Sequence, residues 1–200
     1  MTHTTSTTLL TAVSTRSEDL AVPVKIAAVI FMAVLTAVAA QISIPLPFTP
    51  VPLTLQPMVV LLGGAALGAR LGMASQVLYL TAGLAGLPVF AVSPTLPQGV
   101  FRLLGPTGGF LMAYPFAAFL TGWLAERGFD RRYVTSVVAM TAGLALVFAF
   151  GVSWFAWFAR PAAVGLSAAL QLALYPFVLV DLVKLLLVAT VLPSVWKFTR

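Results

Sequence analysis

The chain has 200 residues, of which 60% are hydrophobic and 8% charged, and its formal net charge is +6. A soluble domain needs roughly a quarter of charged residues to cover its surface. This composition therefore excludes an ordinary soluble domain and predicts an integral membrane protein. The cations are scattered along the chain, which argues against nucleic-acid binding. With no cysteine and a single histidine, His3, the sequence predicts neither disulfides nor a metal site.

Residues 1–22 are rich in Thr and Ser and predict a flexible cytoplasmic tail. The rest of the chain, residues 23–197, contains six apolar segments of about the length that a membrane-spanning helix requires. These segments cover residues 23–43, 52–69, 71–88, 105–125, 133–158 and 174–195. The predicted fold is thus an all-α integral membrane protein, with six transmembrane helices in one bundle.

The first two segments carry small residues at four-residue spacing. Ala33 and Ala37 form such a row in the first segment, and Gly64, Gly68 and Gly72 form one in the second. Small residues at this spacing let membrane helices approach closely. Either row can pack inside the bundle or dock against another membrane protein, and the sequence alone leaves both interpretations open.

The distribution of cations between the loops predicts the orientation of the bundle. One side of the predicted bundle receives Arg16, Lys25, Arg70, Arg127, Arg131, Arg132, Lys197 and Arg200. The other side receives only Arg102 and Arg160. Because cytoplasmic loops carry an excess of Lys and Arg, both termini are expected in the cytoplasm.

The loops that this orientation places outside are long. Residues 44–52 and 88–104 are rich in proline, which stiffens the chain, so we expect them to act as lids over a site. Residues 161–173 are too short to span a membrane, and we expect a short interfacial helix there.

The last apolar segment contains two charged residues, Asp181 and Lys184. Residues three apart share one helix face, so both side chains are expected to point into the same space. A charge near the centre of a bilayer costs about 2.5–3.5 kcal/mol, and such residues usually face a bundle interior or a wet cavity. The pair therefore predicts a binding site, although a purely structural ion pair would give the same pattern.

Other polar residues lie near the outer ends of their predicted helices: Gln56, Gln76, Tyr79 and Arg102. Arg102 suits bidentate binding of a carboxylate, but it could equally anchor the protein at lipid headgroups. Gln76 and Tyr79 could equally form hydrogen bonds between helices.

The sequence contains no phosphate-binding G-x-x-x-x-G-K-[ST] motif and no recognisable catalytic set, so it predicts a protein that is not an enzyme. Two other interpretations remain open. Asp181 could be the protonation site of a proton- or ion-coupled carrier that acts alone. Lys184 could be the nucleophile of an intramembrane enzyme.

Four stretches together resemble the BioY family, the biotin-binding membrane subunits of energy-coupling-factor vitamin importers. In chain order they are "FTPVPLTLQ" at 48–56, "SQVLYLTAGLAGLPVFA" at 75–91, "GPTGGF" at 105–110 and "YPFVLVDLVK" at 175–184. The resemblance covers about residues 25–195. It implies a multi-pass protein of the bacterial cytoplasmic membrane that binds biotin without a cofactor of its own. It also implies a membrane coupling subunit and two ATPase subunits as partners, and these ATPases would use the ATP. The same scaffold could serve another vitamin.

The resemblance also implies roles for individual residues. The D-x-x-K pair of the last helix would contribute to the biotin pocket as Asp181 and Lys184, and Arg102 is similar to a pocket arginine of the family. The family's pocket asparagine has no counterpart, because this chain contains no asparagine, so Gln98 or Gln76 would replace it. Aromatic side chains would pack on the biotin bicycle, and the candidates are Tyr79, Phe90 and Tyr175. Partner docking would use Ala33 and Ala37.

Overall fold

A computed structural model describes residues 8–10, 21–93, 97–161 and 163–198, and nearly all of its regular structure is helical. The helices from the first apolar segment onward are α2 (Ala21–Gln41), α3 (Gln56–Leu67), α4 (Ala69–Leu84), α5 (Val100–Leu104), α6 (Gly108–Ala125), η2 (Phe129–Arg131), α7 (Tyr133–Trp157), α8 (Leu166–Ala173), α9 (Tyr175–Val188) and α10 (Val191–Phe198). Two short strands, β1 (Ser43–Ile44) and β2 (Leu53–Thr54), pair in antiparallel register. The all-helical fold class is as predicted.

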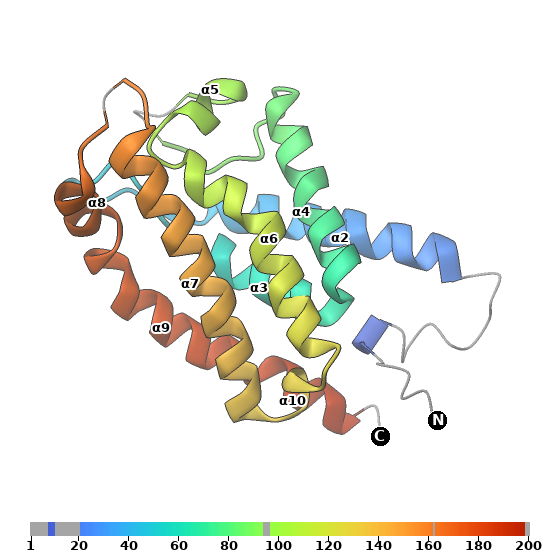
Figure 1. The fold of residues 1–200 in the computed structure, drawn as a ribbon. Helices are drawn as coiled ribbons and strands as arrows, with labels where there is room; N and C mark the ends of the chain where they lie inside the picture. Colours follow the sequence, from blue (N-terminus) through green and yellow to red (C-terminus); the bar gives the residue numbers. More distant parts are fainter. Residues whose placement is uncertain (1–7, 11–20, 94–96, 162, 199–200) are drawn as a thin grey trace.

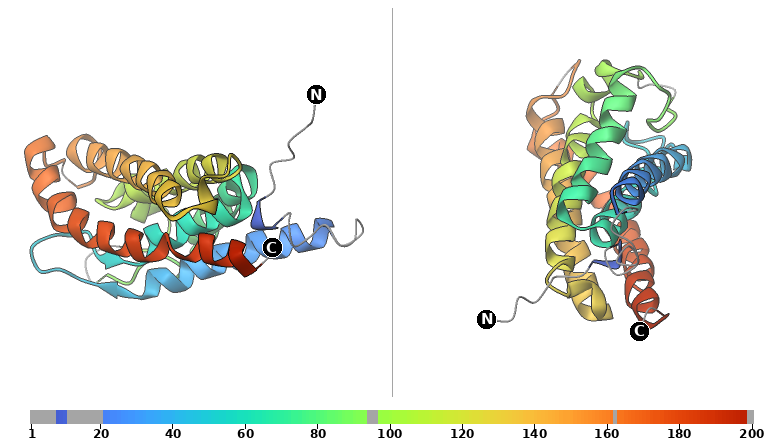
Figure 2. Two further views of the ribbon diagram at one scale, coloured as in Figure 1. Left: turned by 90° about the horizontal axis from the view of Figure 1, so that it is seen from below. Right: turned by 90° about the vertical axis from the view of Figure 1, so that its right-hand side faces the viewer.

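Helix α6 is central to the bundle and packs against α3, α4 and α7. Helix α2 crosses α3 and α4 on one side, and α9 closes the other side against α3, α7 and α8 (Figures 1 and 2). One end of the bundle carries α5, α8 and the loops beside them, and the opposite end carries η2 and α10 (Figure 1). These are called the α5 end and the α10 end below.

Four helical segments of the described chain are long and apolar enough to cross a membrane: Val22–Gln41, Gly108–Ala125, Tyr133–Trp157 and Tyr175–Lys197. Helices α3 and α4 have 12 and 16 residues. At 1.5 Å per residue they are about 18 and 24 Å long, less than the roughly 30 Å of a hydrocarbon core. The protein is therefore a multi-pass membrane protein, while its six crossings stay a prediction.

The glycine row of the second segment fixes the packing of α3, α4 and α6. A Cβ on Gly64 would lie 2.3 Å from the backbone oxygen of Ala118, and a Cβ on Gly72 would lie 2.7 Å from the Cα of Gly64. Gly68, with φ +86°, instead forms the break between α3 and α4. Close packing through this row is confirmed for Gly64 and Gly72, because larger side chains would separate the helices.

Helix α2 turns its small residues toward the bundle. Ala33 is buried in the main hydrophobic core, and Ala37 packs against that core. The outward face carries Ile30, Val34 and Val38, which are about half exposed. This structure therefore favours the interior-packing interpretation of the alanine row. Docking of a partner on Ala33 and Ala37 stays a prediction, and it would require their present neighbours to move.

Residues 8–10 belong to the segment predicted as a flexible tail, yet they lie against the α10 end of the bundle. Leu9 is buried in a small apolar cluster with Ala65, Ala125 and Leu192. The predicted tail thus contributes one apolar contact through Leu9, and its flexibility stays a prediction. Residues 1–7 and 11–20 of the predicted tail lie outside the described residues.

Candidate binding site

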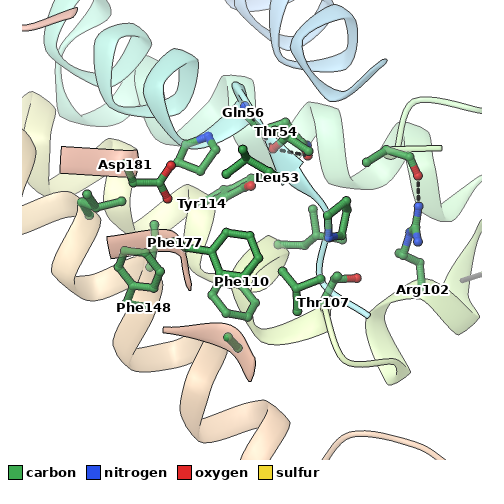
Figure 3. Close-up of a pocket in the computed structure, with 18 residues that line it drawn as sticks. Leu53, Thr54, Gln56, Arg102, Thr107, Phe110, Tyr114, Phe148, Phe177 and Asp181 are labelled. Atoms are coloured by element: carbon green, nitrogen blue, oxygen red, sulfur yellow. Dashed lines mark hydrogen bonds between the residues drawn. The ribbon is translucent and has the colours of Figure 1, made fainter. Parts of the chain in front are cut away.

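A cavity lies inside the α5 half of the bundle, between the β1–β2 hairpin, α3, α5, α6, α7 and α9 (Figure 3). It contains about 610 Å³ of empty space, including the space at its mouth. Its lining residues are Val51, Pro52, Leu53, Thr54, Gln56, Pro57, Ala91, Arg102, Thr107, Phe110, Leu111, Tyr114, Leu144, Val147, Phe148, Ala173, Phe177 and Asp181. Segments from both predicted lid loops contribute to this wall.

A buried ion pair from α9 lies at one side of the cavity. Lys184 Nζ lies 2.9 Å from Asp181 Oδ1 and donates a second hydrogen bond, also of 2.9 Å, to the backbone oxygen of Thr54. Asp181 lines the cavity, whereas Lys184 stands behind it and joins α9 to strand β2. The two residues share a helix face as expected, but only Asp181 lines the cavity, so the expectation that both side chains point into it is not supported for Lys184. The lysine instead fixes the carboxylate in the cavity wall.

Unpaired hydrogen-bonding groups lie at the other side of the cavity. Arg102 is 2% exposed, and its Nη2 donates to the carbonyl oxygen of Ala91. Arg102 Nη1 and Thr107 Oγ1 are buried without a hydrogen-bond partner among the described residues. Figure 3 shows Arg102 and Asp181 on opposite sides of the lining residues. A buried polar group without a partner is costly, so these two groups favour a polar guest.

Aromatic side chains form the part of the wall nearest Asp181. They are Phe110 and Tyr114 of α6, Phe148 of α7 and Phe177 of α9. Phe110 and Phe148 meet edge to face, with their ring centroids 6.3 Å apart. A ligand that fits this cavity would have an apolar, ring-like body and polar groups at both ends.

Gln56, Tyr79 and Phe90 are linked by side-chain contacts on one side of the cavity. Gln56 lines the cavity and donates a hydrogen bond of 2.7 Å to the hydroxyl of Tyr79, which donates in turn to the backbone oxygen of Val89. Phe90 packs edge to face on Tyr79, with a centroid distance of 5.6 Å. Tyr79 and Phe90 are therefore not among the lining residues, and this structure does not support their direct packing on a ligand.

Three other predicted residues lie away from the cavity. Gln76 points toward α2, where its Nε2 donates to Thr36 Oγ1 at 3.2 Å, so it joins helices as the alternative interpretation held. Gln98 is exposed in the loop before α5. Tyr175 is 64% exposed, because the first turn of α9 directs it outward. Contacts of these three residues with a ligand are not supported by this structure.

Several lining residues escaped the sequence analysis, although helical spacing carried a signal for some of them. Phe177 lies one turn before Asp181 on α9, and Phe110 and Tyr114 are four residues apart on α6. Thr107 belongs to the quoted "GPTGG" stretch. Leu144 and Phe148 of α7 also line the cavity. No polar residue in the sequence indicated this, because it depends on how the helices pack.

A second hollow lies beside the cavity along α7. It is an apolar groove between α7, α8 and α9, with Ala145, Ala149, Leu174 and Val178 among its lining residues. Leu144 and Phe148 line both this groove and the cavity. The two spaces therefore adjoin at α7.

A helical bundle with membrane-length apolar helices and an interior cavity, polar at both sides and aromatic within, defines a membrane-embedded solute-binding protein. The chain belongs to the BioY family, whose model matches residues 7–200. It is 41% identical over 150 residues to a probable biotin transporter BioY of Pyrococcus horikoshii, covering 75% of this chain and 82% of that one. It is 36% identical over 157 residues to the biotin transporter BioY of Thermotoga maritima, covering 78% and 86%.

The fold is similar to a solved structure of the biotin S-component of an ECF-type ABC transporter. The TM-score is 0.78 at 25% sequence identity, and the match covers 90% of this chain and 94% of the other. The family and these relatives are transporters, in agreement with the prediction of a protein that is not an enzyme.

Proposed function

We propose that this protein captures biotin at the outer side of the bacterial cytoplasmic membrane and delivers it inward together with an energy-coupling module. The family membership and the biotin-transporting relatives support the substrate. Support for the mode of action comes from the likeness to a biotin S-component. In this arrangement the α5 end faces outward, both termini are cytoplasmic, and α3 and α4 complete six membrane segments.

The chemistry of biotin suits the two sides of the cavity. Its ureido ring offers two N–H donors and a carbonyl, its bicycle is apolar, and its tail ends in a carboxylate. Asp181 accepts a ureido N–H, and Lys184 holds that carboxylate ionised and in place. Phe110, Tyr114 and Phe177 pack around the bicycle.

The observation that carries the proposal is the unpaired side of the cavity, where Arg102 Nη1 and Thr107 Oγ1 lack partners among the described residues. Burial lowers the pKa of the Arg102 guanidinium from its ordinary value, because desolvation disfavours its charged form. A nearby anionic carboxylate favours the charged form of the guanidinium. It also accepts hydrogen bonds from Arg102 and Thr107.

Delivery depends on partners. A membrane coupling subunit and two cytoplasmic ATPase subunits supply the energy, and ATP is consumed by those subunits. This chain contains no phosphate-binding G-x-x-x-x-G-K-[ST] motif.

Calorimetry on the purified protein in detergent tests the ligand and its orientation. Biotin should bind more tightly than thiamine or riboflavin. Biotinamide, which lacks the negative charge, should bind roughly 10- to 150-fold more weakly than biotin, as expected for one charge-assisted contact. In Arg102→Gln this difference between biotin and biotinamide should shrink, because only the contact with Thr107 remains. Tighter binding of another vitamin would contradict biotin as the substrate. Equal binding of biotin and biotinamide to the wild type would contradict the placement of the biotin carboxylate beside Arg102.

Uptake measurements test the dependence on partners. Labelled biotin should enter proteoliposomes that contain the chain with its coupling module and ATP, and it should not enter those with the chain alone. Uptake by the chain alone that disappears when the proton gradient collapses would contradict the proposal and indicate a secondary carrier.

A further inference from the structure

A second polar hollow, the arginine pocket, lies at the α10 end of the bundle, far from the ligand cavity. It is lined by Arg127, Gly128, Phe129, Arg131, Arg132 and Thr135 of the loop between α6 and α7 and the first turn of α7. Its empty space is about 930 Å³, including solvent at the mouth. The transport function proposed above uses none of these residues.

Two of the guanidinium groups are held on indole rings. Arg127 lies 3.4 Å from the ring centroid of Trp123, and it also donates a hydrogen bond of 2.8 Å to that residue's carbonyl oxygen. Arg131 lies 5.2 Å from the ring centroid of Trp196. Stacking orders the planar groups, and each guanidinium has five N–H donors in a geometry that matches a phosphate.

The acidic residues of this loop are not among the residues that line the pocket. Asp130 is 1% exposed and accepts a hydrogen bond of 2.6 Å from Trp196 Nε1. Glu126 accepts a hydrogen bond of 2.9 Å from the backbone N–H of Ala69 at the start of α4. The described lining thus contains three arginines and no carboxylate, although Asp130 interacts electrostatically with Arg131. Helix α7 also begins here without a side-chain cap in the described chain, so its N-terminal dipole adds to the attraction for an anion.

The surroundings of the pocket are those of a membrane–water interface. Trp123 and Tyr133, two residues of the kind enriched at that interface, are 39% and 43% exposed beside it. Farther along the same helices, α6 and α7 expose the apolar side chains of Phe119, Val134 and Val138. A ligand bound here would thus contact the arginines at one end and the exposed apolar side chains of α6 and α7 along the rest of its length.

We propose that the arginine pocket binds the phosphate of an anionic phospholipid headgroup, with the acyl chains lying along the exposed faces of α6 and α7. Basic pockets beside membrane helices attract such lipids, and each arginine near the surface contributes about a fivefold gain in affinity.

Native mass spectrometry of the full chain, purified with equal amounts of phosphatidylglycerol and phosphatidylcholine, tests the site. The wild type should retain phosphatidylglycerol preferentially. Arg132→Gln should lower this preference about fivefold, and Arg127→Gln with Arg132→Gln roughly 25-fold. Arg160→Gln, an exposed arginine at the α5 end, is the matched control and should leave the preference unchanged. Gel filtration shows that each variant is folded, and the single substitution provides the test if the double variant aggregates.

An unchanged preference in the folded Arg132→Gln and double variants, or an equal loss in Arg160→Gln, would overturn the site. Two competition arms test the source of the anion. Displacement of phosphatidylglycerol by millimolar inorganic phosphate at constant ionic strength would indicate a soluble phosphate ligand instead. Displacement by micromolar polyglutamate would indicate an acidic protein partner. Retention of the lipid in both arms is the expected result.

Discussion

At the scale of single residues, the ion pair of Asp181 and Lys184 is the feature on which ligand recognition depends. A buried pair is costly to form, and removing one partner leaves the other charge uncompensated. Here Lys184 is also bonded to the backbone of β2, so it keeps a hydrogen bond when the carboxylate is changed. The function of Asp181 can therefore be tested with limited damage to the bundle.

Asp181→Asn should weaken biotin binding about 10- to 150-fold, which is the range for loss of one charge-assisted hydrogen bond. Calorimetry in detergent measures the change. Tyr175→Phe is the control, because the exposed Tyr175 should not influence affinity. Wild-type affinity in Asp181→Asn would remove this carboxylate from the site.

Asp130 gives the protein a dependence of stability on pH. Burial raises the pKa of the Asp130 carboxyl above its ordinary value, although the hydrogen bond from Trp196 opposes the shift. The folded state therefore binds this proton more tightly than the unfolded state, and its contribution to stability is lost as pH rises from the unfolded pKa through the folded pKa. Burial of Asp130 is therefore less favourable at neutral pH than at acidic pH.

Asp130→Asn should consequently raise the melting temperature at pH 7 relative to the wild type, and this difference should shrink at pH 4.5. Thermal unfolding in detergent at the two pH values measures it. A difference that grows on acidification would mean that the carboxylate is stabilised in its ionised form.

The residues of the candidate site were predictable where a charge is out of place in an apolar segment. Asp181 lies in the last apolar segment and lines the cavity, because a membrane bundle tolerates buried charges only around a polar interior. Arg102 lies in an outer loop, where it was one of only two cations, and it lines the cavity as well. Tyr175 was not predictable in the same way. An aromatic residue at the start of a helix is equally suited to lipid and to a ligand, and only the rotation of α9 decides between them.

At the scale of elements, α2 has two different faces. The alanine face packs into the core, and the branched aliphatic face points outward. Ala33→Trp should therefore destabilise the isolated protein by about 1–3 kcal/mol through overpacking. Val34→Trp, on the outward face, should leave its melting temperature nearly unchanged. Thermal unfolding of both variants in detergent measures the contrast.

Uptake assays with the coupling module extend this comparison to partner docking. If Ala33 served only as a docking contact, Ala33→Trp would melt like the wild type and still fail to support uptake. Instability of Ala33→Trp in isolation would instead identify Ala33 as a packing residue.

The sequence predicted the helical elements well where apolar runs are long. The segment 133–158 became Tyr133–Trp157, and 105–125 became Gly108–Ala125. The segment 52–69 became shorter, since Leu53 and Thr54 pair with β1 in an extended hairpin before α3 starts. The last segment divides at residues 189–190 into α9 and α10, which an uninterrupted apolar run does not reveal. The predicted short helix at 161–173 is confirmed over Leu166–Ala173.

At the scale of the whole molecule, the absence of cysteine from the sequence makes the orientation directly testable. Ala163→Cys at the α5 end and Arg132→Cys at the α10 end each place one thiol at an exposed position. In intact cells a membrane-impermeant maleimide should label the first, and it should label the second only after permeabilisation, because cation-rich loops remain inside. The reverse pattern would contradict the proposed orientation.

The shared position of Leu144 and Phe148 between cavity and groove has a consequence for the range of ligands. The stiff, proline-rich hairpin limits expansion of the cavity toward water, whereas at α7 the cavity adjoins the apolar groove through the shared residues Leu144 and Phe148. Shortening Phe148 should therefore enlarge the cavity toward this groove. New specificity for a bulkier vitamin is therefore most readily evolved, or engineered, through the lipid-facing wall.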